Sequence, residues 1–175
     1  MKTKLRVNND IESVFNYFSR KDYLIKYFDQ EKVPPRIISE IDSEFFSEDE
    51  KIKLIFEDDE IVQHILVDEI KIKPDTSIFM RISYGKIIDK SDFDPLSDNE
   101  ANYLNEKFNQ ASGNGFHYTI LFNKDGEYVN VVEITEVFIK NLFVKIFWLS
   151  IGFYNKIKQT NVRRRIKQEI EMIKK

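Results

Sequence analysis

Two histidines are the residues in this chain most able to carry acid–base or metal chemistry, and both lie in segments that predict β-strands. Neither His64 nor His117 has a second histidine at the spacing of a metal-binding helix, and the chain contains no cysteine. We therefore expect no metal site and no thiolate chemistry, and we interpret both histidines as structural or solvent-facing. A catalytic role would require an imidazole oriented by Glu133 or Glu136, since a carboxylate on a strand can orient a base.

Other motifs match functional sites only in part. The acidic runs at 47–50 and 57–60 lack the central glycine and the terminal glutamate spacing of a calcium loop, so they predict solvated hairpin turns. Gly-Asn-Gly at 113–115 is not followed by the lysine of a phosphate loop. The three arginines at 163–165 point in three directions on a helix and form no single patch. The sequence therefore predicts no catalytic residue and no cofactor.

Composition limits the class of protein. Of the 175 residues 42% are hydrophobic and 33% are charged, which is typical of a globular domain rather than a disordered chain. The formal charge of -3 provides no overall attraction for nucleic acid. The absence of cysteine and of an apolar N-terminal segment is what we expect of a cytoplasmic protein. Fifteen Phe and eight Tyr indicate either an aromatic core or a cavity lined with rings.

Hydropathy patterns predict a strand and two short helices, followed by a run of antiparallel strands. Residues 2–8 alternate as a half-buried strand, and Asn9 or Asp10 is placed to cap a helix that begins at residue 11. A second short helix precedes Pro34-Pro35. Period-two alternation then predicts strands at 36–45, 51–57, 61–73, 77–84, 116–123 and 127–137. Residues 36–84 and 116–137 are therefore expected to form one antiparallel sheet.

The remaining segments predict helices. Ser97 followed by Glu100 is a capping box, so 97–110 is expected to be a helical insertion between two strands of a single domain spanning 1–175. Residues 139–173 carry an apolar stripe of helical period and predict a long C-terminal helix across the concave face of the sheet. The predicted fold class is α+β, with a curved antiparallel sheet wrapped around that helix.

This order of elements resembles the START-like superfamily, which includes the polyketide cyclase/dehydrase, lipid-transport and Bet v 1-like proteins. The resemblance rests on the opening strand that runs into VNNDIESVFNYF, on the strand pair HYTILFNKDGEYVNVVEIT, and on the terminal helix through VRRRIKQEIEMIKK. It extends over nearly the whole chain as a pattern of elements rather than as a diagnostic motif. The resemblance implies a helix-grip fold with a cavity between the sheet and the C-terminal helix.

The predicted function is binding of a small apolar or amphipathic molecule, lipid-like or polyketide-like, in that cavity without catalysis. Alternation places one set of strand residues on the inward face, and the polar tips of two tyrosines or of His117 would orient the ligand. The predicted ligand-binding residues are Met80, Ile82, Tyr84, His117, Tyr118, Ile120, Phe122, Phe143, Phe147 and Phe153.

Two alternatives remain open at this stage. A cyclase or dehydratase acting in the same cavity would need a buried acid or base, such as an inward-facing His64, His117 or Glu133. An interaction protein would instead use the segment 137–154, which is apolar nearly all round, to contact a membrane surface or a second copy of the chain. That segment is too short and too charged to predict a transmembrane helix.

Overall fold

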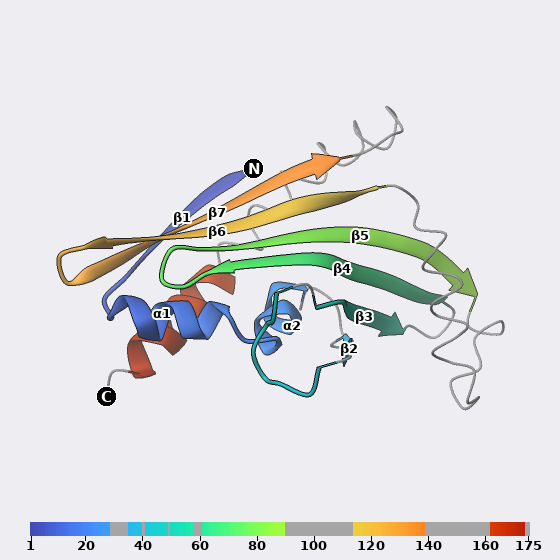
Figure 1. The fold of residues 1–175 in the computed structure, drawn as a ribbon, viewed down its shortest axis with the longest axis horizontal. Helices are drawn as coiled ribbons and strands as arrows, with labels where there is room; N and C mark the ends of the chain where they lie inside the picture. Colours follow the sequence, from blue (N-terminus) through green and yellow to red (C-terminus); the bar gives the residue numbers. More distant parts are fainter. Residues whose placement is uncertain are drawn as a thin grey trace.

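The computed structural model contains one curved antiparallel sheet with helices gathered on one side of it (Figure 1). It describes residues 1–28, 35–39, 41–48, 50–57, 61–89, 114–138 and 162–173. The strands are β1 Lys2–Val7, β2 Arg36–Ser39, β3 Ile52–Glu57, β4 Ile61–Lys73, β5 Ser77–Asp89, β6 Gly115–Asp125 and β7 Tyr128–Phe138. The helices are α1 Ile11–Phe18, α2 Asp22–Phe28 and a C-terminal helix described over 162–173.

The seven strands are arranged in the order β1-β7-β6-β5-β4-β3-β2, and all pairs are antiparallel. The predicted sheet is therefore confirmed, and β1 joins it beside β7. Short turns connect the central strands: Asp75 has a φ of 52° in the β4–β5 turn, and Gly126 has a φ of 63° in the β6–β7 turn. Glycine adopts this left-handed conformation at little cost, as the sequence signal at Gly126 predicts.

A bulge in β4 explains a change of phase in its hydrophobic pattern. Ile65 and Val67 are buried at even spacing, but the next buried residue is Ile70. The register with β5 shifts between Val67 and Glu69, so Asp68 is the extra residue of a β-bulge. Because of this insertion, Ile70 faces the same side of the sheet as Val67.

The core lies between the concave face of the sheet and the helices. Val14 and Phe18 of α1, Leu24 of α2, and Ile166 and Ile170 of the C-terminal helix are at most 4% exposed and belong to one cluster with the inward side chains of the strands. Figure 1 shows the three helices together on that side of the sheet. The helical part of the prediction is confirmed where the structure describes it, whereas 97–110 and 139–161 lie outside the described residues.

Hydrogen bonds hold the start of α1 and the C-terminal helix together. Asp10 caps α1, because its side chain accepts a hydrogen bond of 2.8 Å from the backbone N–H of Ser13. Asn9 is 3% exposed, and its side chain donates to the carbonyl of Ile170 at 2.9 Å. Of the two residues predicted to cap the helix, one does so and the other attaches it to the chain's last helix.

The prediction of a strand over 36–45 is wrong beyond Ser39. The backbone of the next segment bonds to the turn between α1 and α2 rather than to a neighbouring strand: Phe46 N donates to Ser19 O at 2.8 Å, and Lys21 N donates to Glu44 O at 2.8 Å. Ile41 and Phe45, which share one parity of the predicted strand, are exposed. The period-two pattern in this segment therefore does not correspond to a pleated strand.

Candidate functional site

Five of the predicted ligand-binding residues lie together on the concave face. Their side chains are at most 4% exposed and point toward the helices from adjacent positions on β5 and β6. Met80 pairs with Tyr118 in the register, and Ile78 pairs with Ile120. The five residues are Met80, Ile82, Tyr118, Ile120 and Phe122. Tyr84 follows Ile82 on the same face of β5 and is only partly buried.

His117 lies on the opposite face of the sheet, which corrects its predicted place among the ligand-binding residues. It alternates with Phe116 and Tyr118, so its ring points away from the helices, where it contacts Phe79 at 5.6 Å and Phe138 at 5.1 Å between ring centroids. A histidine on the convex face cannot orient a ligand held on the concave face. The remaining predictions, Phe143, Phe147 and Phe153, lie outside the described residues.

The concave face is closely packed next to α1. Phe122 contacts Phe15 at 5.3 Å and Phe18 at 5.7 Å, both in edge-to-face arrangements between ring centroids. Such contacts are typical of a filled core. This end of the concave face therefore supports the fold rather than a ligand.

A second group of rings, farther along the concave face, is more open. Tyr27 lies 4.6 Å from Tyr118, Phe28 lies 6.1 Å from Phe56 and 6.3 Å from Phe116, and Tyr84 lies 5.9 Å from Phe116, all between ring centroids. Tyr27, Phe28 and Tyr84 are partly exposed, whereas Phe56 and Phe116 are buried. We call the group Tyr27, Phe28, Phe56, Tyr84 and Phe116 the aromatic strip. Two of its rings come from α2 and three from the sheet.

A buried polar cluster lies at the inner end of the aromatic strip. Glu133 of β7 is 6% exposed, and its Oε1 accepts hydrogen bonds of 2.8 Å from the hydroxyls of Tyr23 and Tyr118. Its Oε2 accepts from Arg163 Nε at 2.8 Å and from Thr3 Oγ1 at 2.9 Å. One carboxylate thus joins β1, α2, β6, β7 and the C-terminal helix.

The protonation states in this cluster follow from its contacts. Burial alone would raise the pKa of Glu133, but the Arg163 charge and the hydrogen bonds from Tyr118, Arg163 and Tyr23 outweigh it, so the pKa lies below its usual value. Burial, together with the charge of Glu133, raises the pKa of Tyr23 and of Tyr118 well above 10. At neutral pH the cluster therefore contains one carboxylate and two neutral phenols.

The two phenols have too few protons for all their contacts. Their oxygens lie 2.6 Å apart, and each lies 2.8 Å from the same oxygen of Glu133. The three oxygens make three close contacts, but the two hydroxyls have only two protons. One of the three pairs of oxygens therefore has no proton between its members. With both hydroxyls donating to Glu133, the pair without a proton is that of the two phenolic oxygens.

The carboxylate at the centre of the cluster is poorly suited to act as a base. A general base needs an available acceptor position and a pKa near the working pH. Both oxygens of Glu133 already accept two hydrogen bonds each, and its pKa is lowered. The cluster is therefore better arranged to position rings and helices than to remove a proton from a substrate.

Sequence reasoning gave Glu133 only a conditional role and missed its partner Tyr23. A local signal was present, since Glu133 has the same parity as Val129 and Val131, both fully buried on β7. A charged residue in a buried register indicates a buried partner. Nothing local identifies Tyr23, which is 110 positions away in the chain.

A second buried ion pair lies in the acidic run at 47–50, which the sequence predicts to be a solvated turn. Glu50 ends the acidic run at 47–50, yet its side chain is fully buried and lies 2.5 Å from Lys21 Nζ, which is itself 8% exposed. Lys21 also donates to Ser39 Oγ at 3.0 Å and to the carbonyl of Ile41 at 2.7 Å, while Ser47 N donates to Glu50 Oε2 at 3.0 Å. This pair attaches the segment 41–48 to the turn between α1 and α2.

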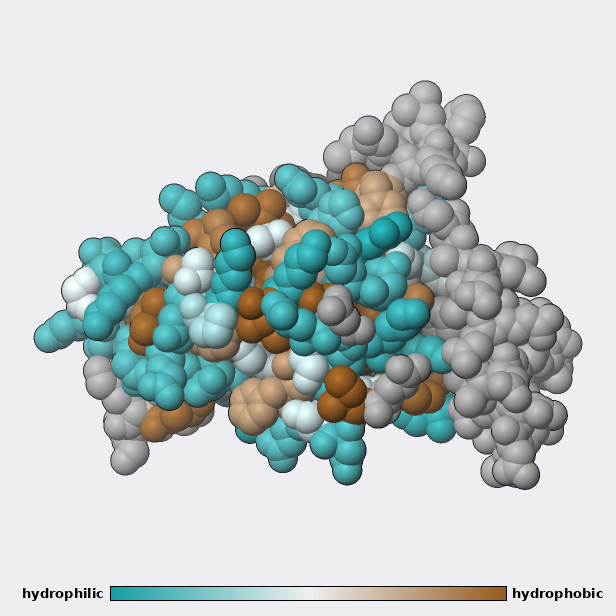
Figure 2. Space-filling view, viewed as in Figure 1, coloured by the Kyte–Doolittle hydropathy of each residue, from teal (hydrophilic) through white to brown (hydrophobic). Residues whose placement is uncertain are grey.

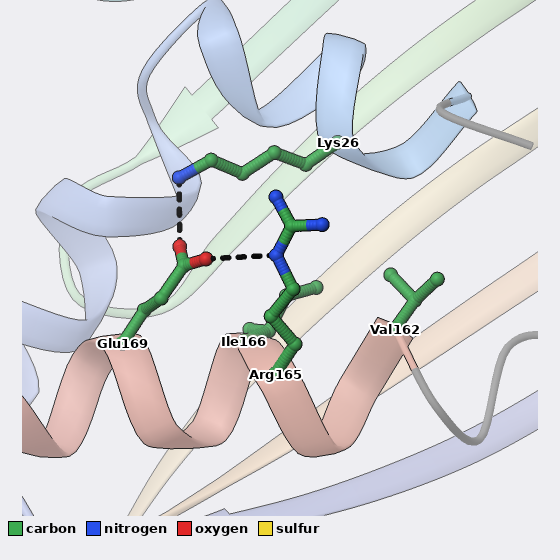
Figure 3. A pocket seen from close by; sticks show the side chains of 5 residues that line it. All are labelled: Lys26, Val162, Arg165, Ile166 and Glu169. Atoms are coloured by element: carbon green, nitrogen blue, oxygen red, sulfur yellow. Dashed lines mark hydrogen bonds and ion pairs between the residues drawn. The ribbon is translucent and has the colours of Figure 1, made fainter. Parts of the chain in front are cut away.

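A small pocket lies between α2 and the C-terminal helix. Figure 3 shows Lys26 reaching across from α2 toward Glu169, while Arg165 bonds the other oxygen of the same carboxylate from within the helix. The pocket has a volume of about 20 Å³. Such a space holds about one water molecule, so it is too small for an organic ligand.

Within the described ranges, no group of three or more His, Cys, Asp or Glu side chains is arranged to hold a metal ion. In the same part of the chain, no helix is long and apolar enough to cross a membrane. Figure 2 shows hydrophilic residues over the strands with hydrophobic side chains scattered between them.

Comparison with known proteins establishes the fold. No family model and no curated protein sequence matches the chain. A conserved protein from Geobacillus kaustophilus matches with a TM-score of 0.56 at 11% identity, over 97% of this chain and 93% of that protein. Ara h 8.0201 matches with a TM-score of 0.55 at 9% identity, over 97% and 95%.

DynU16, a protein from the dynemicin biosynthetic locus, matches with a TM-score of 0.50 at 11% identity, over 95% of this chain but only 46% of that protein. The chain has a helix-grip fold. Its curved sheet, two short helices after the first strand and C-terminal helix are those of the Bet v 1-like structures. At these identities the likeness concerns the fold alone.

Proposed function

We propose that this chain binds a small apolar or amphipathic molecule on the aromatic strip, between α2 and the concave face of the sheet, and does not transform it chemically. The observation that supports this best is that three rings of the strip remain partly exposed on a face that is otherwise closely packed. Partly exposed rings around a concave surface are typical of small-molecule sites.

The strip can contribute useful binding energy. Burying about 250 Å² of apolar ligand surface would contribute roughly 6 kcal/mol before the cost of association. Hydroxyl groups at the strip would fix the orientation of a polar end. Tyr27 is hydrogen-bonded to Thr135, and burial raises its pKa to about 12, so its hydroxyl stays protonated. Burial also raises the pKa of Tyr84.

A cyclase- or dehydratase-type activity is the second candidate, because Glu133 is a buried carboxylate facing the interior. Catalysis would require Glu133 to exchange one of its hydrogen bonds for a substrate proton. All four contacts on this carboxylate are 2.9 Å or shorter, and Arg163 stabilises its charged form. These contacts favour binding without catalysis as the function of the site.

Native mass spectrometry of freshly purified protein tests the proposal, because a molecule that co-purifies has a measurable mass. A titration with the neutral apolar dye Nile red then locates the site. The substitution Tyr84→Leu removes a ring from the aromatic strip, whereas Phe15→Leu removes a ring from the closely packed part of the concave face next to α1. We expect Tyr84→Leu to weaken dye binding severalfold and Phe15→Leu to reduce stability with little effect on affinity. No saturable binding by the parent protein would refute the proposal.

A further inference from the structure

The two halves of α2 are held very differently. Tyr23 and Leu24 are 1% and 0% exposed, and the hydroxyl of Tyr23 donates to Glu133 and lies 2.6 Å from that of Tyr118. Tyr27 and Phe28, one turn later, are partly exposed and contribute the α2 rings of the aromatic strip. The first half of α2 is therefore anchored in the core, and the rings of the last turn cover the sheet side of the strip.

The last turn is attached to the C-terminal helix through Lys26. Its Nζ lies 2.8 Å from Glu169 Oε2 (Figure 3). The same oxygen accepts a 2.7 Å hydrogen bond from the hydroxyl of Tyr17. The side chains of Lys26 and Glu169 are each 27% exposed. An ion pair with this exposure contributes little to stability and weakens in salt. It can therefore hold the turn without locking it.

The length of α2 also favours local opening. The structure describes α2 over seven residues, of which 26–28 are the last three. Short helices derive their stability from packing rather than from intrinsic propensity. Opening the turn at residues 26–28 would therefore expose two rings while the contacts of Tyr23 and Leu24 remain.

We infer that residues 26–28 form a gate over the ligand site. In the empty protein Tyr27 and Phe28 lie against the sheet rings of the aromatic strip, and the Lys26–Glu169 pair is the latch that, together with the Tyr27–Thr135 hydrogen bond, keeps them there. This inference rests on the proposed function. A ligand would bind by replacing the two rings against Phe56, Phe116 and Tyr118. The gate is an equilibrium between a closed and an open state, and the ligand binds only the open state. A weaker latch increases the population of the open state and should therefore raise the apparent affinity for the ligand.

Amide hydrogen exchange of the ligand-free protein tests the gate directly. A gate predicts that the amides of residues 26–28 exchange through local opening, faster than those of Tyr23 and Leu24. Lys26→Met keeps most of the aliphatic stem and removes the charge, and it should accelerate exchange at 27 and 28 only. Uniform exchange along α2, unchanged by this substitution, would overturn the gate whether or not any ligand binds.

The kinetics of dye binding provide a second test of the gate, with a matched control variant at another residue that contacts the Glu169 carboxylate. Glu169→Gln removes the latch, whereas Arg165→Gln removes a partner of Glu169 that belongs to the same helix. Nile red should associate about threefold faster with Glu169→Gln and at an unchanged rate with Arg165→Gln. Added salt should accelerate association with the parent but not with Lys26→Met.

The possible outcomes separate the two proposals. If the parent protein does not bind Nile red, the proposed function fails, and the exchange measurement alone decides the gate. If the parent binds the dye and the amides of 27 and 28 become more protected in the complex, the ligand sits under an unmoved turn and the gate is refuted. Faster exchange at 27 and 28 in the complex is the expected result.

Discussion

Arg163 on the C-terminal helix donates from Nε to Oε2 of Glu133 on β7 at 2.8 Å, and the two side chains are only 17% and 8% exposed. The pair connects the last helix to the strand at the centre of the polar cluster. A buried pair of this kind costs desolvation and is stable only when its remaining lone pairs are satisfied. Here Tyr23, Tyr118 and Thr3 satisfy them.

Removing the charge of Glu133 should destabilise the protein strongly. In Glu133→Gln the side chain keeps its size but leaves Arg163 buried without a counter-charge, so we expect a loss of about 3 kcal/mol in the free energy of unfolding. Glu136→Gln is the matched control, since Glu136 lies on the same strand and is exposed. Urea denaturation measures both. Equal effects of the two substitutions would contradict the central place of Glu133.

Removing one phenolic hydroxyl should cost less than its hydrogen bonds suggest. Tyr23→Phe or Tyr118→Phe leaves one phenolic donor to Glu133 Oε1 and relieves the pair of phenolic oxygens that has no proton between its members. We expect each single substitution to cost at most about 1 kcal/mol and the double substitution to cost more than their sum. A double-mutant cycle in urea measures this coupling. Simple additivity would show that the hydroxyls act independently.

Breaking the Lys21–Glu50 pair should release the segment 41–48. Lys21→Met leaves the Glu50 carboxylate buried without its cation, so we expect a loss of about 3–5 kcal/mol. Arg20→Gln is a suitable control, because its pairs with Asp22 and Glu44 are exposed and should contribute less than about 1 kcal/mol. Limited proteolysis should cut the 41–48 segment faster in Lys21→Met only.

Acid should weaken the attachment of the C-terminal helix through Glu169. Burial tends to raise the pKa of Glu169, but hydrogen bonds from Lys26, Tyr17 and Arg165 lower it to about 2. Since the pKa in the folded state is depressed, the contribution to stability is present above the unfolded pKa of about 4.3 and is lost as the pH falls toward 2. Stability of the parent should therefore fall more steeply than that of Glu169→Gln between these values. If the free energy of unfolding of the two proteins has the same dependence on pH between these values, Glu169 does not have this role.

The sheet could be predicted from the sequence because its central strands alternate regularly. Ile78, Met80 and Ile82 face inward as predicted, as do Tyr118 and Ile120. The same rule failed at 41–45, where Ile41 and Phe45 have strand parity but the backbone bonds to the α1–α2 turn. Period-two hydrophobicity does not reveal where the backbone hydrogen bonds go.

The polar contacts could not be predicted because they join residues far apart in the chain. Tyr23 meets Glu133 across 110 positions, and Lys26 meets Glu169 across 143. The prediction for His117 is wrong for a different reason: His117 and Tyr118 cannot both line the site, because adjacent residues of a strand face opposite sides. Strict use of that alternation would have placed it on the convex face.

The position of a bound apolar molecule tests the central claim most directly. Isotope-filtered NMR of the uniformly ¹³C-labelled protein with Nile red reports which ring protons lie within a few ångströms of the dye. Binding at the aromatic strip predicts intermolecular contacts with the rings of Tyr84 and Phe116. Contacts confined to Phe79 and Phe138 on the convex face, or no saturable complex at all, would contradict ligand binding between α2 and the sheet.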